Sequence, residues 1–337
     1  MNKKLSLFSG FIFFVLISCD NVKSSTITID NYENASFHMG RGLNKYLNNV
    51  LTYQKWDDQE LFHYKVRFKE KTKSFTIDLK SLKKTDYNDS DKVDSKKNIQ
   101  VVKNNMYEFL SPNGKLAAYI DDFNLWIRNT KTGKRIQLTF DGEKDYGYAT
   151  NNAGWIQSKG PVLKWSPKSD KIATFRQDAR GVGEMYLTTT NVGHPKLQSW
   201  KYALPGDEKI FEIERLIIDV KSKKIVKLKM KNDFQRSTTT DHIAGRGGKL
   251  LDTQWSEDSS KLAFISSSRD HKEAHLQIAD SKTGKVFSVY KENVETYYES
   301  GVRSENWKVL FDSNEFIWYS EKDNWGHIYL YDLNTKK

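Results

Sequence analysis

The fold of this chain is decided by one stretch, Trp165-Ser-Pro-Lys-Ser-Asp-Lys-Ile-Ala-Thr-Phe175. Trp165 ends an apolar run, and the six residues after it supply turn chemistry, because proline fixes φ and serine and aspartate bond to their own backbone. Ile172 to Phe175 then resume a run rich in strand-forming residues. The stretch therefore predicts the end of one strand, a polar turn and the start of the next strand.

The same unit recurs along the chain. Two further copies are Phe109-Leu-Ser-Pro-Asn-Gly-Lys-Leu-Ala-Ala-Tyr119 and Trp255-Ser-Glu-Asp-Ser-Ser-Lys-Leu-Ala-Phe264, and a degraded copy is Phe311-Asp-Ser-Asn-Glu-Phe-Ile-Trp-Tyr319. Neighbouring copies lie roughly 55 residues apart, except for a gap of roughly 90 residues between Trp165 and Trp255, which leaves room for one more unit. Such a period, with several short strands per unit, is typical of a β-propeller. The sequence predicts an all-β propeller with about six recognisable blades.

The composition favours strands and a solvated basic surface. Trp, Tyr and Phe make up 13% of the chain, and flat rings pack well on pleated sheets. The net charge of +11 comes mostly from lysines scattered between the predicted strands, with 43 acidic residues interspersed. A basic balance can indicate nucleic acid or an anionic membrane as partner. Because no arginine-rich helix or RNA-binding motif accompanies it, we expect ordinary solvated charge and no nucleic-acid partner.

The N-terminus has the pattern of an export signal. Lys3 and Lys4 precede an apolar run from Leu5 to Ile17, too short to span a bilayer as a helix. Leu16-Ile-Ser-Cys19 resembles a bacterial lipobox, and Cys19 is the single cysteine of the chain. We predict a signal peptide over residues 1–19, acylation of Cys19 as a membrane anchor, and a cell-envelope location facing the periplasm or the surface. An ordinary signal peptide with an incidental cysteine, or a membrane helix, are the alternatives.

Residues 20–52 are expected to form a tether and N-terminal segment, and residues 53–337 the propeller. Residues 32–59 have no clean period, which predicts part helix and part strand. Alternation in Leu61–Phe68, followed by Ser74–Leu79, predicts an antiparallel hairpin. Lys83–Asn98 is charged and lacks an apolar period, so we expect a solvated loop. In the first full unit, residues 116–120, 125–127 and 135–139 are predicted strands, joined by turns at 121–124 and 131–134.

The order of short phrases in this unit resembles a known family. Ser111-Pro-Asn-Gly-Lys115, Asn124-Leu-Trp126, Thr132-Gly-Lys134 and Leu138-Thr139 follow one another as in the propeller of the dipeptidyl peptidase IV branch of the prolyl oligopeptidase family. Later phrases continue the resemblance, which covers about residues 53–334. These are Asp145–Trp155, His194-Pro-Lys196, Trp200–Asp207 and Asn314–Asp332. The resemblance implies an N-terminal β-propeller, here incomplete or open.

The resemblance also implies what the chain does. In that family an α/β-hydrolase domain after the propeller carries the G-x-S-x-G nucleophile, and no G-x-S-x-G occurs here. We therefore expect the substrate-gating, non-catalytic portion of a cell-envelope serine exopeptidase, with no catalytic residue of its own. The expected partners are a peptide in the propeller channel, the membrane through acylated Cys19, and a hydrolase domain or further copies of the chain. A stand-alone envelope lipoprotein that binds peptides or a protein is the alternative. No cofactor is expected, and no metal, because the seven histidines lack ligand spacing.

Substrate contacts are predicted in the loops. Relatives hold the substrate amine with a Glu-Glu pair, and the corresponding place after Trp155 reads Ile156-Gln-Ser-Lys-Gly160, without that pair. Asp145, Glu184 and Glu299 are the candidate carboxylates, with solvated loop charge or hairpin capping as the alternative. Arg180, like Arg176 and Arg303, is a candidate for the channel, with salt bridges between loops as the alternative. The predicted core between blades comprises Leu116, Trp165, Phe175, Trp255, Phe264 and Trp318.

Overall fold

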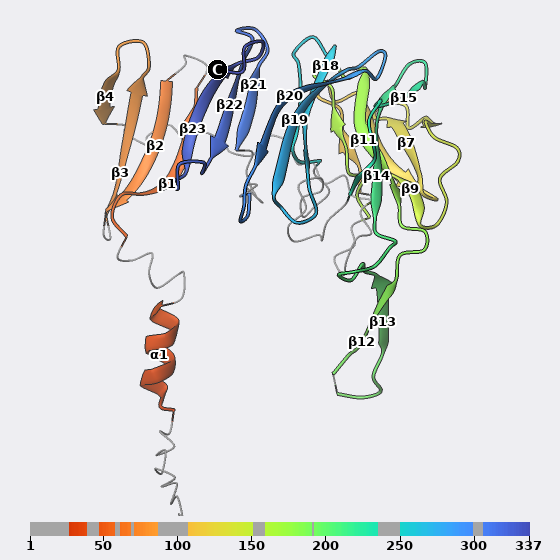
Figure 1. Cartoon of the computed structure of the whole chain (residues 1–337), viewed down its shortest axis with the longest axis horizontal. Coiled ribbons are helices and arrows are strands. Elements are labelled where there is room, and N and C mark those ends of the chain that lie inside the picture. The colour runs from red at the N-terminus through yellow and green to blue at the C-terminus, as the bar shows by residue number, and fades with distance from the viewer. Residues whose placement is uncertain are drawn as a thin grey trace, which may run out of the picture. The chain divides into compact units, whose positions relative to one another are not determined.

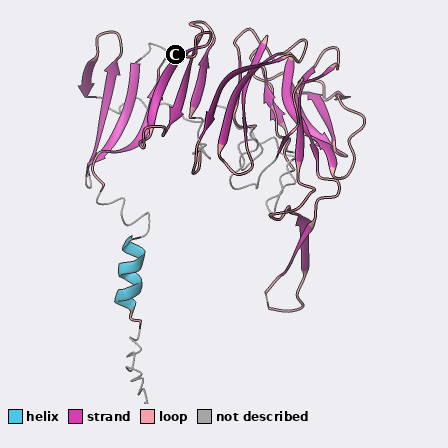
Figure 2. Cartoon of the chain, viewed as in Figure 1, coloured by secondary structure: helices cyan, strands magenta, loops and turns pink. Residues whose placement is uncertain are grey.

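The computed structural model describes residues 27–38, 47–57, 61–68, 71–86, 107–150, 159–190, 192–234, 250–298 and 306–337. Contacts divide the chain into two compact units, residues 1–100 and 101–337, and strands dominate both (Figure 2). None of the helices in the described ranges has the length and apolar character of a membrane span. The predicted signal peptide over residues 1–19, with Cys19, lies outside the described residues.

The described part of unit 1 holds one helix and one antiparallel sheet. Helix α1 is Ile29–His38, and the sheet runs β1 (Val50–Trp56), β2 (Leu61–Phe68), β3 (Lys71–Asp78) and β4 (Lys83–Asp86) in sequence order. The hairpin predicted from Leu61 is confirmed by the pairing of β2 with β3. The expected loop over Lys83–Asn98 is wrong for its first four residues, which form β4 because they pair with Phe75–Asp78. Residues 87–98 lie outside the described part.

Unit 2 is a succession of small antiparallel sheets (Figure 1). Three of them run in sequence order, each strand hydrogen-bonded to the next. The first is β5 (Phe109–Leu110), β6 (Leu116–Asp121), β7 (Asn124–Asn129) and β8 (Arg135–Gln137); the third is β17 (Thr253–Trp255), β18 (Lys261–Ser267), β19 (Glu273–Asp280) and β20 (Val286–Asn293); the fourth is β21 (Trp307–Leu310), β22 (Glu315–Ser320) and β23 (His327–Asp332). The strands expected in the first complete unit are therefore confirmed.

The second sheet of unit 2 accounts for the long gap between Trp165 and Trp255. It contains β9 (Tyr146–Tyr148), β10 (Lys164–Trp165), β11 (Lys171–Asp178), β14 (Glu212–Asp219), β15 (Ile225–Lys227) and β16 (Asp233–Phe234). Between β11 and β14 the chain leaves the sheet as the hairpin β12 (Glu184–Thr188) and β13 (Leu197–Lys201), which projects from it in Figure 1. Within the described residues the gap thus adds a two-stranded sheet, and the expectation of a further full unit there is wrong.

The recurrent turns share one backbone conformation. Gly114, Ser169, Ser259 and Asn314 occupy the same position in the four copies and have φ values of 70°, 60°, 61° and 58°. Serine and asparagine tolerate this left-handed region when local hydrogen bonds hold the turn. In three copies the same bond forms: the hydroxyls of Ser111, Ser166 and Ser256 accept from the amides five residues on, at 3.1, 3.0 and 2.9 Å. The turn signal read from the sequence is therefore confirmed, including its degraded copy.

The core of unit 2 lies between successive sheets. In β11, Ile172 packs with Leu125 and Ile127 of the first sheet, while Phe175 packs with Phe264 of the third. Successive side chains of a strand point to opposite faces, so one strand serves two interfaces. A third cluster joins the third and fourth sheets through residues such as Leu276 and Trp318. Of the predicted core residues, Trp165, Phe175, Trp255, Phe264 and Trp318 are buried and Leu116 is half-buried.

Tryptophans also tie the sheets together by hydrogen bonds. The indole N–H of Trp165 donates to the carbonyl of Phe109 at 3.1 Å, and that of Trp255 donates to the carbonyl of Lys164 at 3.2 Å. Each bond runs from the first strand of one sheet to the first strand of the sheet before it. A buried indole that finds an acceptor in this way fixes the spacing of neighbouring sheets.

Candidate functional site

The candidate site lies at the end of the unit 2 sheets opposite the recurrent turns. In an antiparallel meander, the connections from second to third strand and from each sheet to the next all lie at that end. The loops there are 121–124, 140–146, 178–184, 202–212, 268–273, 291–298 and 320–327, and they hold more than twice as many acidic as basic residues. We call this set of loops the acidic end.

Strands β9 and β11 build the centre of the acidic end. They pair antiparallel, with Tyr148 opposite Arg176 and Tyr146 opposite Asp178. Because side chains alternate along a strand, these four residues project from the same face of the sheet. The two tyrosine rings therefore lie beside Arg176, whose guanidinium carbon is 4.2 Å from the ring centre of Tyr146 and 5.5 Å from that of Tyr148.

Arg176 is a buried cation shared by two carboxylates. Its side chain is 9% exposed, and it donates to Asp141 at 2.9 Å and to Glu214 of β14 at 2.7 Å. The hydroxyl of Tyr148 donates to Asp141 at 2.6 Å, and Lys227 of β15 pairs with Glu214 at 2.9 Å. A charge can be buried only when it is paired and hydrogen-bonded in this way. The network joins four strands (β9, β11, β14 and β15) and the loop before β9.

Arg180, four residues on, is its exposed counterpart. It forms two parallel hydrogen bonds with Asp178, at 2.9 and 2.7 Å, and its guanidinium carbon lies 3.7 Å from the ring centre of Tyr146. Its side chain is 52% exposed. Fork-to-carboxylate pairing of this kind fixes the plane of the guanidinium. The salt-bridge alternative for Arg176 and Arg180 is therefore what the structure shows.

These contacts favour the ionised forms of Asp141 and Asp178, because they lower the pKa of each. The hydrogen bond from Tyr148, helped by Arg176, lowers the pKa of Asp141 below its usual value. The hydrogen bonds from Arg180 lower the pKa of Asp178 in the same way. Burial and the neighbouring Asp141 raise the pKa of Tyr148, so its hydroxyl keeps its proton and stays a donor.

The structure brings two of the predicted residues together. The amide of Ala179, next to Arg180, donates to the carbonyl of Asp145 at 2.8 Å, so both residues lie at the acidic end. Glu184 begins strand β12, where it accepts from Tyr186 at 3.1 Å and lies 3.9 Å from Lys201. Glu299 and Arg303 lie outside the described residues. Whether Asp145, Glu184, Glu299 and Arg180 contact a substrate stays a prediction.

Several residues of the site do not stand out in the sequence. Asp141, Tyr146, Tyr148 and Glu214 were not predicted, because the residues that they contact lie on other strands or loops. A signal exists in the alternation of Tyr146-Gly-Tyr148 against Arg176-Gln-Asp178, but it becomes readable only once the two strands are known to pair. Glu143 was also missed; it is 65% exposed and lies 4.0 Å from Arg180.

A hydroxyl–imidazole–carboxylate array occurs in unit 1. His63 lies 2.8 Å from Thr76 through one ring nitrogen and 2.8 Å from Asp57 through the other. Thr76 is buried in the middle of the sheet, where β3 pairs with β2 on one side and β4 on the other. Strand amides engaged in such ladders are not free to stabilise an oxyanion. Thr76, His63 and Asp57 therefore cross-link the sheet and do not form a nucleophile site.

Within the described ranges, no group of three or more His, Cys, Asp or Glu side chains is placed to hold a metal ion. The acidic end instead offers carboxylates, two tyrosine faces and an exposed guanidinium. Carboxylates suit an ammonium group, aromatic faces suit apolar or cationic side chains, and a guanidinium suits a carbonyl or carboxylate. This combination matches the groups that a peptide presents.

Comparison with known proteins supports this view of the fold. The sequence model of the family described as "Dipeptidyl peptidase IV (DPP IV) N-terminal region" matches residues 59–337. The chain belongs to this family. The all-β propeller of the dipeptidyl peptidase IV N-terminal type, predicted from the repeat and the ordered phrases, is thereby confirmed.

Solved structures resemble the propeller at low sequence identity. The dipeptidyl peptidase 4 of Porphyromonas gingivalis superposes with a TM-score of 0.53 at 16% identity, covering 84% of this chain and 36% of its own. A Bacteroides ovatus protein described as a dipeptidyl aminopeptidase IV gives a TM-score of 0.49 at 19% identity, with coverages of 83% and 35%. The first likeness shows the fold. The chain spans about a third of the length of these two relatives.

Proposed function

We propose that this propeller is the substrate-gating, non-catalytic portion of a cell-envelope serine exopeptidase of the dipeptidyl peptidase IV type. The observation that carries the proposal is the family match over residues 59–337. We further propose that the acidic end receives the amino terminus of the peptide and that acyl chains on Cys19 hold the protein at the membrane. The excess of carboxylates in the loops supports the first of these, and the lipobox-like sequence supports the second.

Two carboxylates are best suited to hold an ammonium group. Glu143 and Glu184 are exposed, and their basic neighbours Arg180 and Lys201 lie at 4.0 and 3.9 Å, near the limit of an ion pair. They therefore keep lone pairs for another donor. Asp178 and Asp141 are less available, because Arg180, Arg176 and Tyr148 already donate to them. The ammonium group of a substrate could therefore replace water at Glu143 or Glu184 with little rearrangement of the protein.

A pair of peptides tests this assignment. A short peptide with a free amino terminus and a C-terminal fluorophore should bind about tenfold tighter than its N-acetylated twin, as expected for one charge-assisted hydrogen bond. The measurement is fluorescence anisotropy on the purified chain. The double variant Glu143→Gln and Glu184→Gln should lose the preference for the free amine.

The matched control changes the same number of charges at the other end of the sheets. Glu257→Gln with Asp312→Asn removes two exposed carboxylates from the recurrent turns and should leave the preference intact. Equal affinity for the two peptides in the unaltered chain would contradict the assignment.

A separate experiment tests the lipid anchor. The chain produced in bacteria should incorporate labelled palmitate, and Cys19→Ser should abolish the label. Incorporation that survives this change would exclude acylation of Cys19.

A further inference from the structure

In the described residues, the end of unit 2 opposite the acidic end is formed by two kinds of turn. In each meander the turn between the first and second strands and the turn between the third and fourth strands lie at the same end. Residues 111–115, 166–171, 256–261 and 311–314 form the first kind, and residues 129–134, 219–224, 280–285 and 332–337 occupy the second position. We call these eight segments the lysine face.

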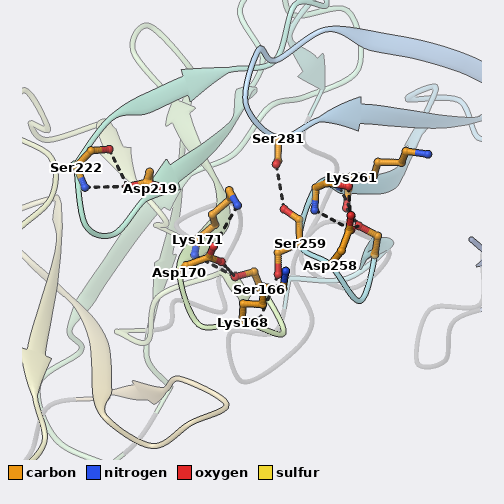
Figure 3. Close-up of polar contacts among 12 residues, drawn as sticks. Ser166, Lys168, Asp170, Lys171, Asp219, Ser222, Asp258, Ser259, Lys261 and Ser281 are labelled. Carbon is orange, nitrogen blue, oxygen red and sulfur yellow. Dashed lines mark hydrogen bonds and ion pairs between the residues drawn. The ribbon is translucent and has the colours of Figure 1, made fainter.

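Hydrogen bonds join six of the eight segments, those of the first three sheets, into one surface. Within sheets, the amides of Thr130, Val220 and Ser281 donate to carbonyls of the neighbouring first-kind turn, at 2.9 to 3.0 Å. Between sheets, the amide of Lys168 donates to the hydroxyl of Ser259 at 3.3 Å, and that of Asn113 to Ser169 at 3.2 Å. Figure 3 shows the junction at Ser259, which also accepts from the hydroxyl of Ser281 through its carbonyl at 3.0 Å.

Lysines scattered in the sequence gather on this face. The eight segments hold nearly twice as many lysines as acidic residues. Most of these lysines are exposed and make no ion pair within the described part of the chain. The set comprises Lys115, Lys131, Lys134, Lys168, Lys221, Lys224, Lys261, Lys282, Lys336 and Lys337.

Five of the six aspartates of the face, all except Asp312, accept hydrogen bonds within their own turns. Asp280 accepts from the amides of Lys282 and Thr283, and Asp332 from those of Asn334 and Thr335. These bonds also consume amide groups that could otherwise cradle a bound anion. The lysine face therefore presents many separate ammonium groups to solvent and does not arrange its amides as a binding site for a single phosphate.

From this we infer that the lysine face docks on a bilayer surface that carries anionic lipid headgroups. The partner is a surface and not a nucleic acid, because the eight segments contain no arginine and a single aromatic residue, Phe311, which packs into the core. Proteins that bind single-stranded nucleic acid combine basic grooves with aromatic stacking platforms. An anionic bilayer needs only exposed lysines spread over the contact, each adding to binding without fixed geometry. The opposite charge of the acidic end favours this one orientation.

Vesicle binding tests the inference on the full chain carrying Cys19→Ala, which cannot be acylated at that position. The readout is the ratio of binding to vesicles with about one third phosphatidylglycerol over binding to pure phosphatidylcholine vesicles. The apolar stretch near the N-terminus can insert into both kinds of vesicle, so its apolar contribution to binding cancels in this ratio. We expect a ratio of at least about tenfold at low salt, which disappears at about 1 M salt, where charges are screened within a few ångströms.

Charge reversal locates the contact. Lys131, Lys134, Lys224 and Lys282 changed to Glu should lower the ratio at least about tenfold. The matched control, Lys144, Lys209, Lys231 and Lys272 changed to Glu, alters four exposed lysines near the other end and should change it by less than about twofold. If the reversal variant fails to fold, Lys→Gln at the same four positions should still lower the ratio at least about fivefold.

Three results would overturn the inference. One is equal binding to anionic and neutral vesicles, and another is an equal loss in the face variant and its control. The third is binding of a single-stranded DNA oligonucleotide that depends on the four lysines while the vesicle ratio does not. Because none of these measurements involves a peptide, failure here is distinguishable from failure of the proposed peptide site.

Discussion

At the lysine face, polar side chains bond to partners close by in the chain: the hydroxyl of Ser166 reaches Asp170 and the amide of Lys171, four and five positions away. At the acidic end, Arg176 bonds to Asp141 and Glu214, which are 35 and 38 positions away. The turns of the first end are therefore held mainly by local bonds, with a few bonds between sheets such as that of Lys168 with Ser259. The network at the second end depends on contacts that exist only after the sheets have assembled. The charges follow the same division: in the described part of the chain most lysines of the first end make no ion pair, whereas the buried cation of the second is shared by two carboxylates.

This difference means that the two ends should respond differently to substitution. A turn that satisfies itself can lose one bond and keep its shape, since its neighbours in sequence remain in place. A buried ion network loses several partners at once when its central residue is removed. We therefore expect the acidic end to be the more sensitive of the two to changes of single polar residues.

The largest effect should come from the central cation of the acidic end. Arg176→Met removes the donor to Asp141 and Glu214 and should lower the free energy of unfolding by about 2–3 kcal/mol, the range for charge-assisted hydrogen bonds of a buried group. Arg180→Met, four residues on and exposed, should cost less than about 1 kcal/mol. Urea denaturation followed by tryptophan fluorescence measures both. Equal losses would show that burial of Arg176 does not separate the two arginines.

A smaller effect is expected from the junction between two turns. Ser259 is fully buried and its hydroxyl accepts from the amide of Lys168. Ser259→Ala should cost about 1 kcal/mol, because that amide loses its partner while alanine adopts the left-handed φ no more easily than serine. Ser313→Ala, at an exposed turn position, is the control and should change stability by less than about 0.5 kcal/mol. A loss as large as that of Arg176→Met would remove the contrast between the ends.

The smallest effect concerns acid. The pKa of Asp141 in the folded chain lies below its ordinary value of 3.8, so the stability it contributes is present above that value and is lost as the pH falls through the folded pKa. Asp141→Asn should therefore be less stable than the unaltered chain at about pH 7, with a difference that shrinks towards about pH 2. Urea midpoints across this range measure it. Tyr148→Phe removes the main donor to the same carboxylate and should show the same convergence; a difference independent of pH would contradict the assigned cause.

The sequence predicted the strands and turns of the repeat well because both depend on neighbours. The polar turn after Trp165 and the strand from Ile172 follow from residues within a few positions, and the left-handed position recurs even where Asn314 replaces serine. The prediction failed between Trp165 and Trp255, because the length of that gap does not reveal that β14 returns to pair with β11. It failed again at Lys83–Asp86, where a segment with three charged residues forms a strand because an edge position was available beside β3.

The candidate site divides in the same way. Arg180 and Asp145 were named as candidates because they are charged residues in predicted loops. Tyr146, Tyr148 and Glu214 were missed because their partners lie on other strands. The grouping of the lysines was missed for a related reason. In sequence they are scattered between strands, and a scattered pattern indicates an ordinary solvated surface.

The sequence by itself determined the repeated strand–turn–strand unit, the all-β propeller and the family, because hydrogen bonds within turns and the two-residue period of strands are local properties. Only the tertiary structure decided which charges meet. Antiparallel meanders place every first and third turn at one end of the sheets and every second turn at the other, so residues far apart in sequence become one surface. That arrangement of strands places Arg176 beside two carboxylates and gathers the lysines on one face.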